Sequence, residues 1–215
     1  MKMNRIRKRQ KLYIQAFFCI AGFILFPLFI HRPFPYTMIS VAGLALPARI
    51  LAGGIKSGSE LSGIIRLRRP HKPFISLGAG MVAGVTLAGY YRHFLGITLF
   101  PESLTWFALL AALIGGSEEF IFRGIIQGYF SKISLSFAVV FAAFAHSGYK
   151  TFLFTTLPEA SGSGLFYLFA ITFGVGLLAG VLKEFSGSIV PPILGHVVFD
   201  ILVYGQSASA PWWVW

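Results

Sequence analysis

The stretch that decides how this chain folds is GGSEEFIFRG, residues 115–124, which lies inside the apolar run 104–129. A membrane-spanning helix needs about 20 mainly apolar residues, so this run is long enough to cross a bilayer. It nevertheless contains three charged residues, Glu118, Glu119 and Arg123. Because ionisable side chains are costly at membrane depth, they mark a candidate functional site there.

The composition of the whole chain favours a membrane protein. Of its 215 residues, 56% are hydrophobic and 12% are charged, and the mean hydropathy is +0.75. Soluble domains carry about 25% charged residues, so this chain lacks the polar surface that water requires. Besides 104–129, six apolar runs are candidate spans: 12–30, 36–54, 74–92, 133–149, 163–182 and 188–206. The predicted fold is an all-α, polytopic transmembrane helical bundle of about seven spans.

The chain is expected to have three parts along its sequence. Residues 1–103 would hold the N-terminal spans and a basic loop at 55–73, and residues 104–206 the helical core that carries the candidate site. Residues 207–215 form a short aromatic tail. Its Trp212, Trp213 and Trp215, like Trp106, are placed as interfacial anchors.

The net charge of +11 is distributed asymmetrically. Basic residues crowd the amino-terminal segment and the loop 55–73, while Lys132 and Lys183 follow or precede later spans on the same predicted side. This pattern predicts a cytoplasmic amino terminus, in a bacterial inner membrane, with anionic lipid at the basic segments. No nucleic-acid-binding module accompanies the charge, so nucleic acid is not an expected partner. The basic residues of the two segments are Lys2, Arg5, Arg7, Lys8, Arg9 and Lys11, and Lys56, Arg66, Arg68, Arg69 and Lys72.

The charges within 104–129 have a spacing that suggests separate tasks. Glu119 and Arg123 are four residues apart, so they share a helix face and are expected to pair. That pairing would leave Glu118 freer to react. Two adjacent carboxylates in a medium of low dielectric constant cannot both ionise cheaply, so one is expected to take up a proton, as a general base must.

Two later spans carry further ionisable residues. His146 stands near the end of 133–149, and His196 and Asp200 are four residues apart in 188–206. A carboxylate on the same helix face can accept from one ring nitrogen and aim the other. Counted from the inferred cytoplasmic ends at about 1.5 Å per residue, Glu118 and these three side chains lie ~12–20 Å into the membrane. We therefore expect them to meet.

Order and spacing of these residues resemble the CPBP (CAAX protease and bacteriocin-processing) intramembrane proteases. The match consists of Glu118, Glu119 and Arg123, then His146, then His196 and Asp200, and it covers roughly residues 104–206. The resemblance implies hydrolysis of a peptide bond of a membrane-associated protein. In the family the cleaved segment is the end of a prenylated CAAX protein, a bacteriocin leader or a carboxy-terminal sorting tail.

The chain departs from the family pattern at two positions. Ala142 stands where the family often has phenylalanine, and Asp200 stands where the CAAX endopeptidases have asparagine. Asparagine can donate a hydrogen bond to an oxyanion, whereas an ionised aspartate cannot. Asp200 is therefore expected to orient His196 rather than to contact the oxyanion.

The mechanism expected from these residues is hydrolysis by water that Glu118, with or without His146, deprotonates. His196 would stabilise the oxyanion, and Glu119 and Arg123 would form a structural pair. This version needs no cofactor. A zinc version, with His146, His196 and a glutamate as ligands, remains an alternative. So do non-enzymatic functions, namely a proton-coupled carrier or a bacteriocin-immunity protein.

Overall fold

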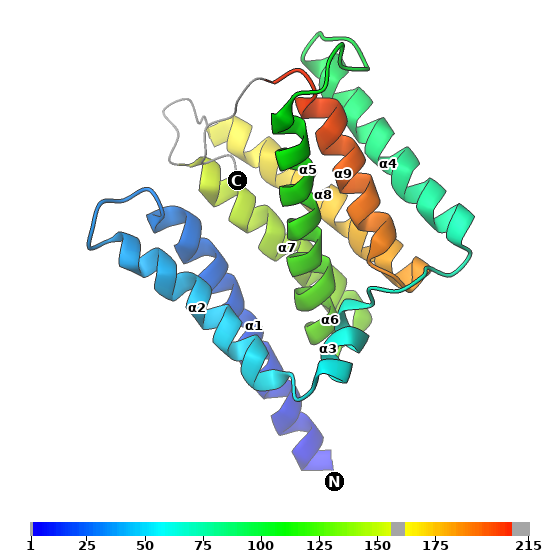
Figure 1. Cartoon of the computed structure of the whole chain (residues 1–215). Helices are drawn as coiled ribbons and strands as arrows, with labels where there is room; N and C mark the ends of the chain where they lie inside the picture. Colours follow the sequence, from blue (N-terminus) through cyan, green and yellow to red (C-terminus); the bar gives the residue numbers. More distant parts are fainter. Residues whose placement is uncertain (1, 156–161, 208–215) are drawn as a thin grey trace. The chain divides into compact units, whose positions relative to one another are not determined.

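The computed structural model of the chain describes residues 2–155 and 162–207, and within this part the regular elements are all helical. Figure 1 shows their arrangement along the sequence. The elements are α1 (Lys2–Phe29), α2 (Thr37–Gly54), α3 (Gly58–Ile65), α4 (Pro73–Phe94), α5 (Trp106–Glu119), the π-helix η1 (Phe120–Gln127), α6 (Gly128–Phe130), α7 (Leu135–Phe154), α8 (Gly162–Ser186) and α9 (Val190–Tyr204). The predicted anchors Trp212, Trp213 and Trp215 lie outside the described residues.

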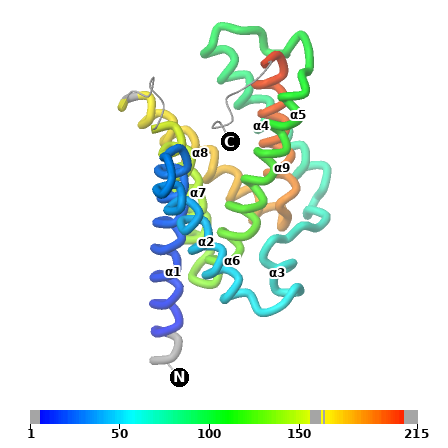
Figure 2. Tube along the Cα trace, turned by 60° about the vertical axis from the view of Figure 1, so that its left-hand side comes forward, coloured from blue at the N-terminus to red at the C-terminus, as the bar shows by residue number. Residues whose placement is uncertain are grey.

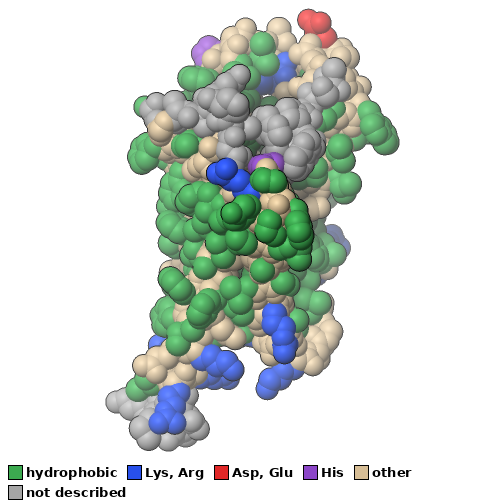
Figure 3. Space-filling model, turned by 90° about the vertical axis from the view of Figure 1, so that its left-hand side faces the viewer, with side chains coloured by type: hydrophobic (Ala, Val, Ile, Leu, Met, Phe, Trp, Pro, Cys, Tyr) green, Lys and Arg blue, Asp and Glu red, His purple; other side chains and the backbone are tan. Residues whose placement is uncertain are grey.

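The predicted membrane bundle is confirmed as an all-helical chain with several spans. Five helices of the described part are long and apolar enough to cross a membrane: Ile6–Phe29, Thr37–Gly54, Pro73–Phe94, Leu135–Phe154 and Gly164–Ser186. The remaining two predicted spans correspond to shorter pieces, since α9 has 15 residues and 104–129 is divided among α5, η1 and α6. On the face seen in Figure 3, hydrophobic side chains cover the middle, and Lys and Arg side chains gather toward its lower end.

Two local features differ from what hydropathy predicts. The basic loop 55–73 contains a short helix, α3, in which Glu60 accepts a hydrogen bond from the backbone N–H of Lys56 at 2.8 Å. The run 104–129 changes from α-helix to π-helix at Phe120. Hydropathy reports how apolar a window is, and it carries no information on the hydrogen-bond pattern of the helix that fills it. A π-helical stretch is rare and is frequently found at functional sites.

The chain forms two compact units, and the first consists of Met1–Ile64 and Ile126–Leu178. In this unit α1 lies beside α2, as Figures 1 and 2 both show. The helices approach closely at Gly22, where a Cβ atom would lie 2.4 Å from the carbonyl oxygen of Gly43. Helix α7 also packs on α1, with the rings of Tyr13 and Phe137 edge to face at 5.2 Å.

The second unit consists of Ile65–Ile125 and Ala179–Trp215. Its centre is α9, which packs against both α4 and α5. Small residues allow the close approach of α4, because a Cβ atom on Gly84 would lie 2.3 Å from the carbonyl oxygen of Gly195. Buried Arg92 donates to the carbonyl oxygen of Leu202 at 2.7 Å and so ties α4 to the last turn of α9. This unit holds five of the six predicted site residues on α5, η1 and α9.

Candidate active site

Glu119 is the centre of the cluster on the second unit. Its Oε1 atom lies 3.0 Å from Nη1 of Arg123 and 3.0 Å from Nδ1 of His196. Glu119 and Arg123 are both buried. The predicted pair between residues four apart is confirmed, although η1 is a π-helix at this point. One carboxylate therefore joins the arginine on η1 to the histidine on α9.

The other ring nitrogen of His196 faces two more carboxylates. Its Nε2 atom lies 3.7 Å from Oδ2 of Asp200 and 4.0 Å from Oε2 of Glu118. Glu118 and Asp200 are each only 5% exposed, whereas the His196 side chain is 20% exposed. His196 is therefore the member of this cluster most accessible to an incoming group.

The carboxylate closest to the His196 ring differs from the one expected. The sequence predicted that Asp200 would accept from a ring nitrogen, because the two residues are four apart on one helix. In the structure Glu119 lies within hydrogen-bond distance of Nδ1, while the 3.7 Å between Nε2 and the Asp200 carboxylate exceeds that distance. Periodicity within α9 could not reveal a partner supplied by α5.

Gly115 allows the cluster to form, and sequence reasoning assigned it no role. A Cβ atom at this position would lie 2.0 Å from Oδ2 of Asp200 and 2.7 Å from Cδ2 of His196. The neighbouring Gly116 has far more room, since its nearest side-chain atoms would be 3.7 Å away. Of the two glycines, only Gly115 is needed for the close approach of the α5 backbone to the His196 and Asp200 side chains of α9.

Lys183 supports η1. It lies near the end of α8 that was predicted to face the cytoplasm. It was predicted to be one of the basic residues on the cytoplasmic side, and its side chain is 0% exposed. Its ammonium group donates to the carbonyl oxygens of Arg123 at 2.6 Å and Gly124 at 3.4 Å. Backbone carbonyls inside a protein need donors, so the charge expected at a surface is used within the fold instead.

We expect Lys183→Met to destabilise the protein because it removes the donor from two buried carbonyl oxygens. Each hydrogen bond from a charged donor contributes about 1.5–3 kcal/mol, so the unfolding midpoint in detergent should fall clearly. Lys56→Met is the matched control, since Lys56 is exposed. Lys183→Arg keeps a charged donor and should recover part of the loss; equal midpoints for Lys183→Met and the control would contradict this role.

His146, the sixth predicted residue, is buried on α7. It belongs to the first unit, so its participation in catalysis rests on the order of the sequence motifs and stays a prediction. Ala142, where the family often has phenylalanine, is also buried on α7.

The zinc alternative requires three protein ligands at about 2.0–2.2 Å from one ion. Within residues 2–155 and 162–207, no group of three His, Cys, Asp or Glu side chains is arranged to hold a metal ion. The zinc version stays an alternative prediction, because its ligand His146 belongs to the first unit and His196 to the second.

The fold and the cluster define an integral membrane protein with a buried Glu-Glu-Arg and His-Asp site. Residues 100–202 match the family model of the type II CAAX prenyl endopeptidases, described as Rce1-like. The match covers just under half of the chain, and it agrees with the family that the motifs indicated. No curated protein and no solved structure matches the chain.

Proposed function

We propose that this chain is an intramembrane endopeptidase in which Glu118 activates water to hydrolyse a peptide bond. One observation supports this above the others. Within the family-matched segment, His196 has three carboxylates around its ring, those of Glu119, Asp200 and Glu118, all within 4.0 Å. This arrangement provides a base, a proton relay and an oriented imidazole without a serine or cysteine nucleophile.

The distance between Glu118 and His196 suits a water molecule between them. Oε2 of Glu118 and Nε2 of His196 are 4.0 Å apart, too far for a direct hydrogen bond. One water can bridge two polar groups at such a separation. The bridging water would donate to Oε2 of Glu118 and accept from Nε2–H of a doubly protonated His196, which leaves a lone pair of its oxygen directed toward an approaching carbonyl carbon.

The reaction then follows from these contacts. Glu118 takes a proton from the water as its oxygen bonds to the carbonyl carbon, and the carbonyl oxygen becomes an oxyanion. The tetrahedral intermediate collapses with cleavage of the C–N bond, and Glu118 passes its proton to the leaving nitrogen. A positioned general base contributes about 10²–10⁴-fold to such a reaction.

The remaining residues position the base and the imidazole. Glu119 accepts from Nδ1–H of His196, which leaves Nε2 directed at the reaction. Arg123 holds Glu119 in place through its 3.0 Å contact. Asp200, 3.7 Å from Nε2, is suited to balance the charge of the ring when it carries a second proton and donates to the oxyanion.

His146 joins this proposal through the family resemblance, as a base that acts together with Glu118. If it contacts the reacting atoms, His146→Ala should reduce peptide cleavage by about a hundredfold or more, and the variant should still insert in the membrane. Cleavage rates of variant and wild type in matched membranes measure this effect. A variant with the wild-type rate would remove His146 from the site.

Metal independence is part of the proposal. Because catalysis would use the side chains alone, incubation with EDTA followed by its removal should leave cleavage unchanged. The control is a purified zinc protease treated in parallel, which should lose its activity. Loss of cleavage here, with recovery on addition of zinc, would favour the zinc alternative instead.

The expected substrate is a membrane-associated protein whose carboxy-terminal tail, CAAX segment or leader is cleaved. We place the enzyme in a bacterial inner membrane with its amino terminus in the cytoplasm, on the strength of the basic segments. The non-enzymatic alternatives, a proton-coupled carrier or an immunity protein, would show no new peptide termini.

A comparison of peptide termini tests the proposed function. Membranes and secreted proteins from cells that carry wild type or Glu118→Gln would be compared by mass spectrometry. A terminus found only with wild type would establish proteolysis and name the substrate. Identical termini at equal expression of the two folded proteins would favour a carrier or an immunity protein.

A further inference from the structure

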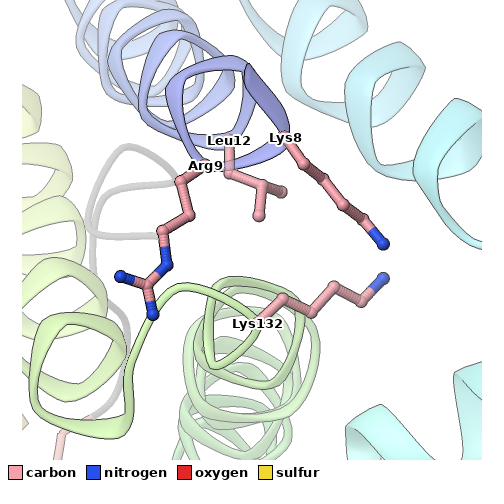
Figure 4. Close-up of a pocket in the computed structure, with 4 residues that line it drawn as sticks. All are labelled: Lys8, Arg9, Leu12 and Lys132. Carbon is pink, nitrogen blue, oxygen red and sulfur yellow. The ribbon is translucent and has the colours of Figure 1, made fainter. Parts of the chain in front are cut away.

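A basic pocket lies at the amino-terminal end of the first span, in the first unit. It is lined by Lys8, Arg9 and Leu12 of α1 and by Lys132 of the turn between α6 and α7, and its volume is about 300 Å³. This is the lower end of the range of small-molecule pockets. Figure 4 shows the long cationic side chains extending from the two elements around the pocket.

Lys132 is held in place by the surrounding structure. Its ammonium group lies 2.7 Å from Oε1 of Glu60 and 4.3 Å from the centre of the Tyr129 ring. These two contacts fix one charge at the pocket before any ligand arrives, which reduces the entropy that binding has to overcome. Glu60 neutralises part of this charge, and its pKa is lowered by the hydrogen bond from Lys132 and by that from the backbone of Lys56.

The positive charge around the pocket favours the binding of an anion. Three cations line it, and no lining residue is acidic; with Glu60 at Lys132, the sum of these four charges is +2. Like charges brought together in this way repel one another unless an anion lies between them. A phosphate group, which can accept hydrogen bonds from ammonium and guanidinium groups at once, matches this set of donors.

The position of the pocket points to a lipid as the source of the phosphate. Lys8, Arg9 and Leu12 belong to the apolar span Ile6–Phe29, near its beginning. Lys8 and Arg9 are exposed, and Leu12 is buried. Basic side chains at the end of a span lie at the depth of lipid headgroups, where each contributes about 1 kcal/mol to the attraction of anionic lipid.

We propose that Lys8, Arg9 and Lys132 form a binding site for the phosphate of an anionic phospholipid headgroup, with Leu12 beside the start of the acyl chains. The site is separate from the residues of the proposed protease chemistry. Its occupation can be measured by binding alone, so failure of one proposal would leave the other intact.

The test is a titration of the full-length protein in detergent with dioctanoyl phosphatidylglycerol, at physiological salt. The double variant Lys8→Gln/Arg9→Gln removes two pocket charges on exposed side chains and should not disturb the fold. We expect its affinity to fall about 30-fold, which corresponds to about 1 kcal/mol for each charge. Lys132→Gln should weaken binding as well.

The matched control is Arg7→Gln/Lys11→Gln, which removes the same charge from the same helix outside the pocket lining. Salt screening should limit its effect to about threefold. Equal losses for both double variants would mean diffuse attraction and overturn the site. Titration with dioctanoyl phosphatidylcholine should give much weaker binding, and equal affinity for this zwitterionic lipid would also overturn it.

A parallel titration with inorganic phosphate distinguishes the two sources of the anion. We expect inorganic phosphate to compete weakly with phosphatidylglycerol, because it lacks the acyl chains beside Leu12. Binding of inorganic phosphate that depends on Lys8 and Arg9, without binding of phosphatidylglycerol, would overturn the lipid as occupant.

Discussion

Glu118→Gln is expected to reduce peptide cleavage by about 10²–10⁴-fold while the protein remains folded. The amide has nearly the shape of the carboxylate, so packing around α5 is preserved. It cannot take a proton from water at neutral pH, so the step that generates the nucleophile is lost. The cleavage rate is measured on the substrate whose new terminus is found only with wild type, with equal amounts of each protein in the same lipid.

Glu102→Gln is the matched control for this prediction. Glu102 is exposed ahead of α5, so the same substitution there should leave the cleavage rate and the unfolding midpoint unchanged. An active Glu118→Gln enzyme would contradict the proposed mechanism. A change in the unfolding midpoint as large as that of a core substitution would instead assign Glu118 a structural role.

The sequence was sufficient to predict several of the helices and one contact of the cluster. Apolar runs 36–54, 74–92 and 188–206 correspond closely to α2, α4 and α9, because a span must satisfy its backbone internally and so follows the length of the apolar run. The contact between Glu119 and Arg123 also followed from a spacing of four residues. Both are local consequences of helical geometry.

Contacts between helices were beyond such reasoning. Lys183 was placed at a membrane surface, because a basic residue at the end of an apolar run usually lies there. The structure instead directs its ammonium group at the Arg123 carbonyl oxygen. The partner of His196 was assigned to its own helix because Asp200 is four residues away, whereas Glu119 of α5 lies closer to the ring. Residues far apart in sequence meet through packing, which a periodicity does not encode.

Gly115 is the clearest case of a residue at the candidate site without a chemical signature. It has no side chain to suggest a role, and in the sequence it is simply the first residue of GGSEEFIFRG. Its importance lies in the space that it leaves for Asp200 and His196. The adjacent glycines gave one usable signal, because glycine inside a helix is unfavourable by about 1 kcal/mol relative to alanine and so suggests a place where another helix comes close.

Gly115→Ala is therefore expected to reduce peptide cleavage by about a hundredfold, through displacement of His196 and Asp200. The added Cβ atom would lie 2.0 Å from Oδ2 of Asp200, so α9 or its side chains must move. Misplacement of a reacting group by about 1 Å is enough for a loss of this size. The kcat of the variant should fall. The unfolding midpoint should fall as well, because atoms of Asp200 and His196 already fill the space that the new methyl group needs.

Gly116→Ala separates this steric effect from the general consequence of replacing a glycine in α5. Its Cβ atom would meet Ile193 and Val197 at 3.7 Å, an ordinary van der Waals contact. The higher helix propensity of alanine should stabilise that variant by up to about 1 kcal/mol, with cleavage close to wild type. Equal cleavage by the two alanine variants would show that the close approach at Gly115 does not set the geometry of the site. A loss confined to Gly115→Ala, by contrast, would locate the reactive geometry at the contact between α5 and α9, because these neighbouring substitutions differ only in what the new methyl group meets.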